Sequence, residues 1–259
     1  MACLATAGPA TAQERPWTPL PSPVSATCTG GLCQPQGLQG FFRAMARQGP
    51  VRIVQFGDSH TAGGDITGGL LSRLQARLRG RDVRLDASGV VGDTLWGLAA
   101  REPLLTADAS PPDLVILAYG TNEGFDVLLD PLAYERLLRD QIRRLRRLVP
   151  EASILVLGAP EAMRGEGGGT CPGDPEARWR APTMLAVVRD VQHRVAAETG
   201  VAFWDWRGRM GGDCSAHALT LGVEPLMRGD HVHFTRAGGD WIGSLLFADI
   251  AAAYARGGG

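Results

Sequence analysis

The sequence predicts an α/β protein with a flavodoxin-like, three-layer α/β/α sandwich around a central parallel sheet. Short apolar runs alternate along the chain with longer stretches whose apolar residues recur at helical spacing. The runs are largely apolar, as expected of strands that are covered on both faces. A chain of 259 residues with 44% hydrophobic content can form this fold as one domain. In such folds the loops at the carboxyl ends of the strands form the functional site.

The first 37 residues are predicted to lie outside the domain. Residues 1–12 are small and apolar and end in Ala-Thr-Ala, a pattern typical of signal-peptide cleavage sites. They lack a charged start and a full apolar stretch, so we interpret them as a truncated signal-peptide remnant, with an ordinary unstructured N-terminus as the alternative. Residues 13–37 are rich in proline and lack periodicity, which predicts an extension along the surface. The domain is expected over residues 38–256.

Strands and helices alternate through this domain. Strands are expected over residues 51–56, 83–87, 114–119, 154–157 and 201–204, and helices over 70–78, 131–149 and 183–199. Thr235 can cap a last helix that runs to about Tyr254. The connection from Ala159 to Arg180 is long for a compact domain and is therefore a candidate rim or lid.

The cysteines suit an oxidising compartment. Removal of a leader would discard Cys3 and leave an even number, Cys28, Cys33, Cys171 and Cys214. Of the three possible pairings we favour Cys28 with Cys33 and Cys171 with Cys214. A zinc site is the competing interpretation, but the first pair has no matching partner pair at finger spacing. With the leader, this predicts a periplasmic or secreted protein.

Charge and hydropathy narrow the possible partners. The formal net charge of -1 creates no overall field toward nucleic acid or an anionic membrane surface. No stretch beyond the leader is long and apolar enough to span a membrane. We therefore expect no nucleic-acid partner and no membrane span, while the sequence does not specify an oligomeric state.

The first candidate for chemistry is Ser59, which directly follows the first predicted strand in Gly57-Asp58-Ser59-His60. A serine there is presented at the end of the sheet, beside free backbone N–H groups that can stabilise an oxyanion. A Gly-Asp-Ser triplet alone is also typical of an ordinary capped turn. The serine therefore needs support from elsewhere in the chain.

That support comes from the turn before the last predicted helix. Asp230 and His233 are three residues apart, so that the carboxylate can orient the imidazole toward a serine on a neighbouring loop. His231 is expected to be a bystander. A helix-capping turn with solvated histidines is the alternative for this segment when it is considered by itself.

Two more segments supply oxyanion donors. Gly92 follows the second predicted strand and offers a backbone N–H, and Asn122 follows the third and offers a side-chain amide. With the Ser59 N–H they make three donors for a tetrahedral oxyanion. All four segments lie at strand ends, and this joint pattern argues against four unrelated turns.

These blocks, FGDSHT, GVVGDT, YGTNE and DHVHFT, resemble those of the SGNH (GDSL-like) hydrolase superfamily. Its four named positions match Ser59, Gly92, Asn122 and His233, and the last block also supplies Asp230. The blocks span residues 56–235, nearly the whole domain. Two departures are His60, where leucine is usual, and Glu123, where many members carry aspartate.

The stretches GDSHT, YGTNE and FWDWRGRMGGDCS further resemble bacterial peptidoglycan O-acetylesterases. This resemblance implies a serine acetylesterase that acts on an O-acetylated cell-wall glycan through an acetyl-serine intermediate, without metal or cofactor. Trp96 and His60 are expected at the substrate rim. The alternatives are an esterase or O-acetyltransferase for another acetylated polysaccharide, and a non-catalytic glycan-binding module. A metal site of Asp58, His60, Asp230, His231 and His233 would leave the serine and the donors unexplained.

Overall fold

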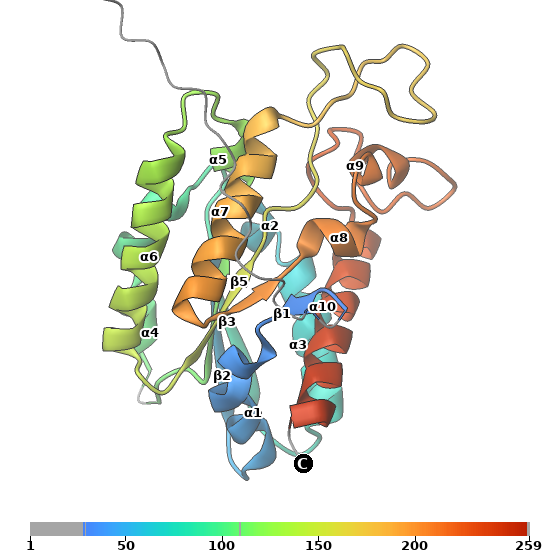
Figure 1. Ribbon diagram of the computed structural model, residues 1–259. Coiled ribbons are helices and arrows are strands. Elements are labelled where there is room, and N and C mark those ends of the chain that lie inside the picture. The colour runs from blue at the N-terminus through green and yellow to red at the C-terminus, as the bar shows by residue number, and fades with distance from the viewer. Residues whose placement is uncertain (1–27, 29, 109, 258–259) are drawn as a thin grey trace, which may run out of the picture.

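The computed structural model describes residues 28, 30–108 and 110–257, so the expected leader and most of the proline-rich extension lie outside the described residues. Within the described part a sheet of six strands forms the middle layer (Figure 1). The strands are β1 (Leu32–Cys33), β2 (Val51–Gly57), β3 (Val83–Gly89), β4 (Leu114–Ala118), β5 (Ser153–Leu157) and β6 (Ala202–Trp204). The five strands predicted from apolar runs are confirmed.

The strand order is β1-β6-β5-β4-β2-β3. Strands β2 to β6 pair in parallel, as expected for a doubly wound sheet, whereas β1 pairs antiparallel with β6 at one edge. In the register Gly57 lies opposite both Gly89 and Ala118. The carboxyl ends of β2, β3 and β4 therefore lie side by side at one end of the strands. The predicted site loops begin there.

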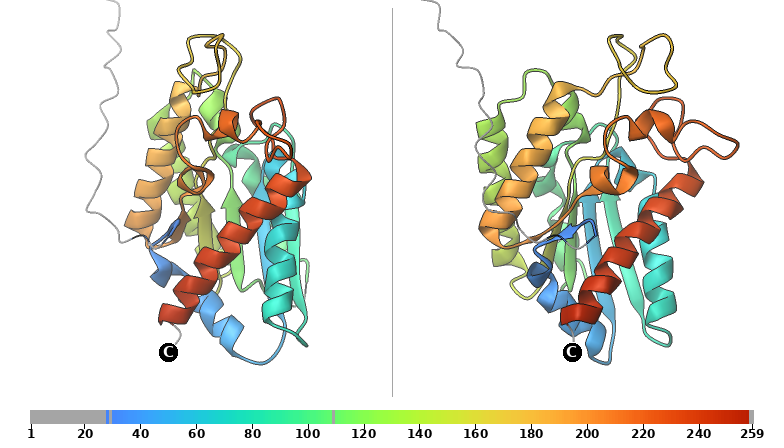
Figure 2. Two further views of the ribbon diagram at one scale, coloured as in Figure 1. Left: turned by 90° about the vertical axis from the view of Figure 1, so that its right-hand side faces the viewer. Right: turned by 45° about the vertical axis from the view of Figure 1, so that its right-hand side comes forward.

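Helices cover both faces of the sheet (Figure 2). One face carries α1 (Gln39–Ala46), α3 (Asp65–Arg77) and α10 (Arg236–Gly257), and the other carries α6 (Pro131–Leu148) and α7 (Thr183–Thr199). Shorter elements are η1 (Pro35–Leu38), α2 (Ser59–Ala62), η2 (Leu95–Arg101), α4 (Pro103–Thr106), α5 (Thr121–Phe125), α8 (Trp206–Met210) and α9 (Ser215–Ala218). The expected three-layer sandwich is therefore present.

The core has two halves that share the strands. Ile53 and Leu114 face the half beneath α1, α3 and α10, whereas Val54, Val115 and Ile154 face the half beneath α6 and α7. Because successive side chains of a strand point to opposite faces, each central strand contributes to both halves. This is why β4 is apolar at every position and β2 is apolar except at Arg52, Gln55 and its final glycine.

Helix ends follow the expected capping chemistry. The Asp130 side chain accepts hydrogen bonds from the Leu132 and Ala133 N–H groups at the start of α6, at 2.9 and 3.2 Å. Thr235 Oγ1 accepts from the Gly238 N–H at 3.1 Å at the start of α10, as predicted. Each such cap satisfies an N–H that the helix itself leaves unpaired.

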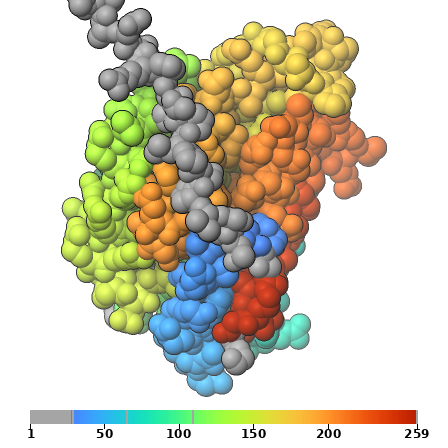
Figure 3. Space-filling view, in the orientation of Figure 1, coloured from blue at the N-terminus to red at the C-terminus, as the bar shows by residue number. Residues whose placement is uncertain are grey.

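The long connection between β5 and α7 is fastened to the domain. Arg164 and Arg180 pair across it, and a disulfide joins Cys171 to Cys214, in the segment after β6. The space-filling view shows this connection, in yellow, packed against that segment, in orange (Figure 3). Both favoured disulfides are present, the other joining Cys28 to Cys33. Within the described residues no helix is long and apolar enough to cross a membrane.

Candidate active site

Ser59 lies where β2 passes into α2. Asp58 is the N-cap of α2, and its Oδ1 accepts the His60 N–H at 2.9 Å. Two glycines allow the turn to pack on the strand ends. A Cβ on Gly57 would lie 2.6 Å from the Ala118 carbonyl oxygen, and one on Gly89 would lie 2.2 Å from the Ala62 nitrogen. Backbone approach this close excludes any side chain at either glycine and fixes the place of Ser59.

His233 and Asp230 reach Ser59 from the turn before α10. His233 Nε2 lies 2.9 Å from Ser59 Oγ, and His233 Nδ1 lies 2.9 Å from Asp230 Oδ2. The other oxygen of Asp230, Oδ1, accepts the N–H groups of Val232 and His233 at 2.9 Å each. The three side chains predicted to act together thus form one hydrogen-bonded chain across 174 positions of sequence.

The surroundings of Asp230 favour its carboxylate form. Partial burial alone would raise the pKa of Asp230, but hydrogen bonds from the His233 and Val232 backbones and from the His233 ring lower that pKa below its ordinary value. An ionised Asp230 accepts the Nδ1 hydrogen of His233. The imidazole then presents Nε2 as an acceptor toward the Ser59 hydroxyl.

The expected oxyanion donors lie on two loops that touch each other. The Asn122 side chain, in α5, donates to the Asp93 carbonyl oxygen at 2.7 Å, next to Gly92. An amide nitrogen carries two hydrogens, so one remains for a ligand. Gly92 adopts a left-handed φ of 76°, which explains the glycine. Their role as oxyanion donors remains a prediction that this geometry permits.

A pocket of about 350 Å³ opens beside the serine. It is lined by Ser59, His60, Ala62, Gly63, Ile66, Val91, Arg228, His233 and Phe234. Val91 belongs to the same loop as Gly92, so this loop forms one wall of the pocket. The pocket is large enough for a small acyl group together with part of the alcohol that carries it.

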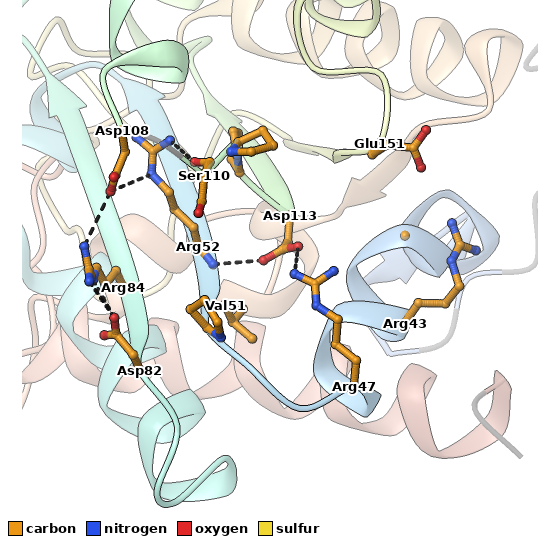
Figure 4. A pocket seen from close by; sticks show the side chains of 14 residues that line it. Arg43, Arg47, Val51, Arg52, Asp82, Arg84, Asp108, Ser110, Asp113 and Glu151 are labelled. Carbon is orange, nitrogen blue, oxygen red and sulfur yellow. Dashed lines mark hydrogen bonds and ion pairs between the residues drawn. The ribbon is translucent and has the colours of Figure 1, made fainter.

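A larger hollow, of about 440 Å³, lies at the amino ends of the strands (Figure 4). Its charged side chains pair with each other, for example Arg47 with Asp113 at 2.8 Å and Arg84 with Asp82 at 2.6 Å. Most of the charged side chains in the hollow are therefore already paired, Arg43 and Glu151 excepted. It lies at the end of the sheet opposite Ser59.

His60 was predicted to lie at the substrate rim, but the structure buries it. It is 6% exposed and forms an inner wall of the pocket. Its Nδ1 lies 3.1 Å from Asp58 Oδ1, and its Nε2 lies 2.9 Å from the Val232 carbonyl oxygen. Both ring nitrogens are thus engaged by the protein, so neither is free for a substrate. The burial arises from Trp206 and Phe234, whose rings pack edge-on against His60.

His231 lies between Asp230 and His233 in sequence but does not line the pocket beside Ser59. It is buried, has a positive φ of 57°, and stacks on Trp179 with ring centroids 3.5 Å apart. Its Nε2 lies 3.0 Å from Nδ1 of His217. His231 therefore joins the turn that carries Asp230 and His233 to the long β5–α7 connection, a role that its sequence spacing does not reveal.

Trp96 is 49% exposed on η2, with its ring 6.0 Å from that of Tyr134. It does not line the pocket beside Ser59, so a rim position for it remains a prediction.

The described residues offer one group of three side chains with converging donor atoms, Cys28, Cys33 and His193. Both of its sulfur atoms belong to a disulfide and are not available as thiolate ligands. Asp58, His60, Asp230 and His233 instead pair two by two.

Glu123 is a buried acid next to Asn122, and sequence reasoning gave it no role beyond a departure from the usual pattern. Its Oε1 accepts the Leu95 N–H at 2.7 Å. Burial raises the pKa of Glu123 from 4.5 to about 7, and the Leu95 hydrogen bond opposes only part of this rise. Glu123 thus ties η2 to the Asn122 helix.

Comparisons with known proteins agree with this arrangement. A family profile described as "GDSL-like Lipase/Acylhydrolase family" matches residues 56–241. No curated protein matches the sequence.

Solved structures share the fold at low sequence identity. A structure titled "Peptidoglycan O-acetylesterase in action, 5 min" is similar with a TM-score of 0.73 at 20% identity, covering 85% of this chain and 96% of the other. A lipase/acylhydrolase from Enterococcus faecalis gives 0.58 at 21%, covering 80% and 96%. An acetyl xylan esterase from Geobacillus stearothermophilus gives 0.55 at 22%, covering 77% and 94%.

Proposed function

Because the chain belongs to the GDSL-like lipase/acylhydrolase family and is thus an acylhydrolase, we propose that it removes O-acetyl groups from a cell-wall glycan, most simply peptidoglycan. The observation that carries the proposal is the hydrogen-bonded chain from Ser59 through His233 to Asp230 at the carboxyl edge of the sheet. The peptidoglycan O-acetylesterase and the acetyl xylan esterase among the similar structures support an acetylated carbohydrate as the substrate.

The proposed reaction begins when Ser59 Oγ attacks the acetyl carbonyl carbon while His233 Nε2 takes the hydroxyl proton. The Ser59 and Gly92 N–H groups and the Asn122 amide would stabilise the oxyanion. As the intermediate collapses, the bond to the sugar oxygen breaks, His233 returns the proton to that oxygen, and acetyl-serine remains.

Deacetylation repeats these steps with water as the nucleophile. His233 takes a proton from water, the hydroxide attacks the acetyl-serine carbonyl, and acetate leaves as Ser59 recovers its proton. This cycle needs no metal and no cofactor.

The setting of the site suits an extended substrate outside the cytoplasm. Trp96 is half exposed, and we propose that it lies at the substrate rim and stacks on a sugar ring. Two disulfides support an extracytoplasmic location, periplasmic or secreted.

The test is acetate release from O-acetylated peptidoglycan, acetylated xylan and a simple aryl acetate, with wild type beside Ser59→Ala. We expect release from peptidoglycan to be fastest. Ser59→Ala should lower turnover by on the order of 10,000-fold without changing the circular dichroism spectrum, because no other group near His233 replaces the nucleophile.

Each possible outcome has a defined meaning. Faster serine-dependent release from xylan would replace the proposed polymer with the one named for the acetyl xylan esterases. Near-wild-type turnover by folded Ser59→Ala would contradict the mechanism. Transfer of acetyl to an added glycan without acetate release would make the chain an acetyltransferase.

A further inference from the structure

A second carboxylate and imidazole, Asp58 and His60, lie directly behind the pair that the proposed reaction uses. The two imidazole rings, of His60 and His233, have centroids 5.5 Å apart. Their surroundings differ sharply, since the side chains of Asp58 and His60 are 1% and 2% exposed, whereas those of Asp230 and His233 are 46% and 34% exposed. The inner pair is therefore shielded from solvent, whereas the outer pair is partly exposed to it.

Donor and acceptor chemistry fixes the hydrogens on the inner ring. The Val232 carbonyl oxygen can only accept, so His60 Nε2 must donate to it across 2.9 Å. His60 Nδ1 faces Asp58 Oδ1 at 3.1 Å, and a carboxylate likewise only accepts. A ring that donates from both nitrogens is an imidazolium, and it is paired here with a buried carboxylate.

The electrostatic surroundings agree with this assignment. Burial alone would lower the pKa of His60, but the Asp58 carboxylate, the Val232 carbonyl and the more distant Asp230 together raise that pKa above its ordinary value. Among the described residues, the rings that pack against His60 are those of His233, Trp206 and Phe234, and the charged Arg228 lines the same pocket.

The hydrogen bond from His60 to Val232 joins the sequence neighbours of Ser59 and His233. His60 directly follows Ser59, and Val232 directly precedes His233. The bond therefore joins the neighbours of the two groups that must meet, and it runs alongside the Ser59 to His233 contact. The ion pair of Asp230 and His233 lies within the His233 turn, so it does not join this turn to the Ser59 turn.

We propose that His60 is a positioning residue for the proposed esterase reaction: as an imidazolium held by Asp58, it donates to the Val232 carbonyl and so holds the His233 turn against the Ser59 turn. The inference rests on the proposed function for its kinetic consequence. His60 touches no reacting atom and acts through the backbone of its neighbours.

The test compares His60→Phe, His60→Gln and wild type in aryl acetate hydrolysis. Phenylalanine keeps the ring that packs on Trp206 but removes both hydrogen bonds, whereas glutamine keeps a donor for Val232 without the charge. His193→Phe is the matched control, since His193 also packs on an aromatic ring, Phe203, but lies in α7, away from the pocket.

We expect His60→Phe to lower kcat by on the order of 10- to 100-fold with KM nearly unchanged, because small displacements of catalytic groups cost this much. His60→Gln should retain more kcat than His60→Phe, and His193→Phe should match wild type. In both His60 variants the acid limb of kcat/KM should move to higher pH, by on the order of one unit, because a cation beside the catalytic base is lost.

Folded His60 variants with wild-type kcat and an unmoved acid limb would overturn the inference. Equal losses in both variants without a shift of the acid limb would do the same, since they would reduce His60 to a packing residue. If His60→Phe fails to fold, as judged by circular dichroism, the test of the inference is the kcat of His60→Gln and the acid limb of its kcat/KM profile.

A direct measurement separates this inference from the proposed function. Nitrogen-15 chemical shifts of the histidine rings at pH 7 should show both nitrogens of His60 protonated in the wild-type protein, whether or not it turns over an ester. A neutral His60 ring would contradict the inference even if acetate release depends on Ser59. Failure of acetate release with a doubly protonated His60 would contradict the proposed function alone.

Discussion

At the scale of single residues, buried acids surround the proposed site. Asp58, Glu123 and Glu161 are each at most 2% exposed. Asp58 pairs with His60, and Glu161 lies between Arg189 and Arg207, at 3.4 and 3.2 Å. Glu123 has no cationic partner among the described residues, so only hydrogen bonds offset its burial.

We therefore predict that stability depends on the ionisation of Glu123. Its pKa is about 7 in the folded protein and 4.5 when exposed, so the folded state binds this proton more tightly than the unfolded state. The resulting stabilisation is complete below pH 4.5 and is lost as the pH rises through 7, a change of about 3 kcal/mol.

Glu123→Gln tests this prediction, because glutamine keeps an oxygen for the Leu95 N–H but never ionises. The free energies of unfolding of wild type and variant, measured with urea, should be similar at pH 5. At pH 8.5 the variant should be more stable by up to about 3 kcal/mol. A difference that is the same at both pH values would show that Glu123 does not ionise as described.

The sequence was sufficient to predict the three site residues whose side chains hydrogen-bond to one another. Ser59, Asp230 and His233 lie at strand or helix ends, where local pattern locates them, and the structure brings them into contact. His60 was misplaced because its burial depends on partners such as Val232, 172 positions away. A local sequence pattern does not show which distant residues will contact a given side chain.

At the scale of elements, the long connection between β5 and α7 is attached to the rest of the domain at several points. The Cys171–Cys214 disulfide fixes one point and the stack of Trp179 on His231 fixes another. His231 lies between Asp230 and His233. The stack of Trp179 on His231 therefore also supports the turn that carries those two residues. We therefore interpret it as a fixed rim and not as a lid.

Removing Cys171–Cys214 should cost more stability than removing Cys28–Cys33. The first joins residues 43 positions apart and the second residues 5 apart, and the entropy lost by the unfolded chain grows with that separation. Replacing both cysteines of each pair by serine should lower the free energy of unfolding by about 4 and about 2 kcal/mol, respectively.

Denaturant unfolding of the two double variants measures these losses. Trypsin should in addition cleave the Cys171→Ser, Cys214→Ser variant more rapidly after Arg164, Arg178 or Arg180, because the connection is then held at one point fewer. Equal losses of stability and equal cleavage rates would contradict the fastening described here.

Long elements were predictable and short ones were not. The helices α3, α6, α7 and α10 have enough residues for a period to be visible, and the five parallel strands were located by their short apolar runs. The two-residue strand β1 and the four- or five-residue helices α2, α5, α8 and α9 have no such signal. Their positions follow from what they pack against.

At the scale of the whole molecule, the two halves of the core depend on each other through the sheet. Leu145 of α6 and Leu246 of α10 are fully buried on opposite faces. The strands between them contribute alternate side chains to each half, so neither half persists when the sheet is lost.

Leu145→Ala and Leu246→Ala should each lower the free energy of unfolding by about 2 to 5 kcal/mol, because each leaves a cavity in a close-packed core. Both variants should still unfold in a single transition. Circular dichroism and tryptophan fluorescence, followed through the same urea titration, check this, and separate midpoints for the two signals would show that the halves unfold independently.

The antiparallel strand β1 has a consequence for how the chain is made. It precedes the rest of the sheet in sequence, yet its partner β6 begins at Ala202, so on a ribosome it emerges long before anything can pair with it. Until then the edge of β6, once formed, is also open to other chains. The hydrogen bonds between β1 and β6 therefore join the first and the last strand of the described sheet in sequence, and they cover an edge of β6 to which another nascent molecule could otherwise pair.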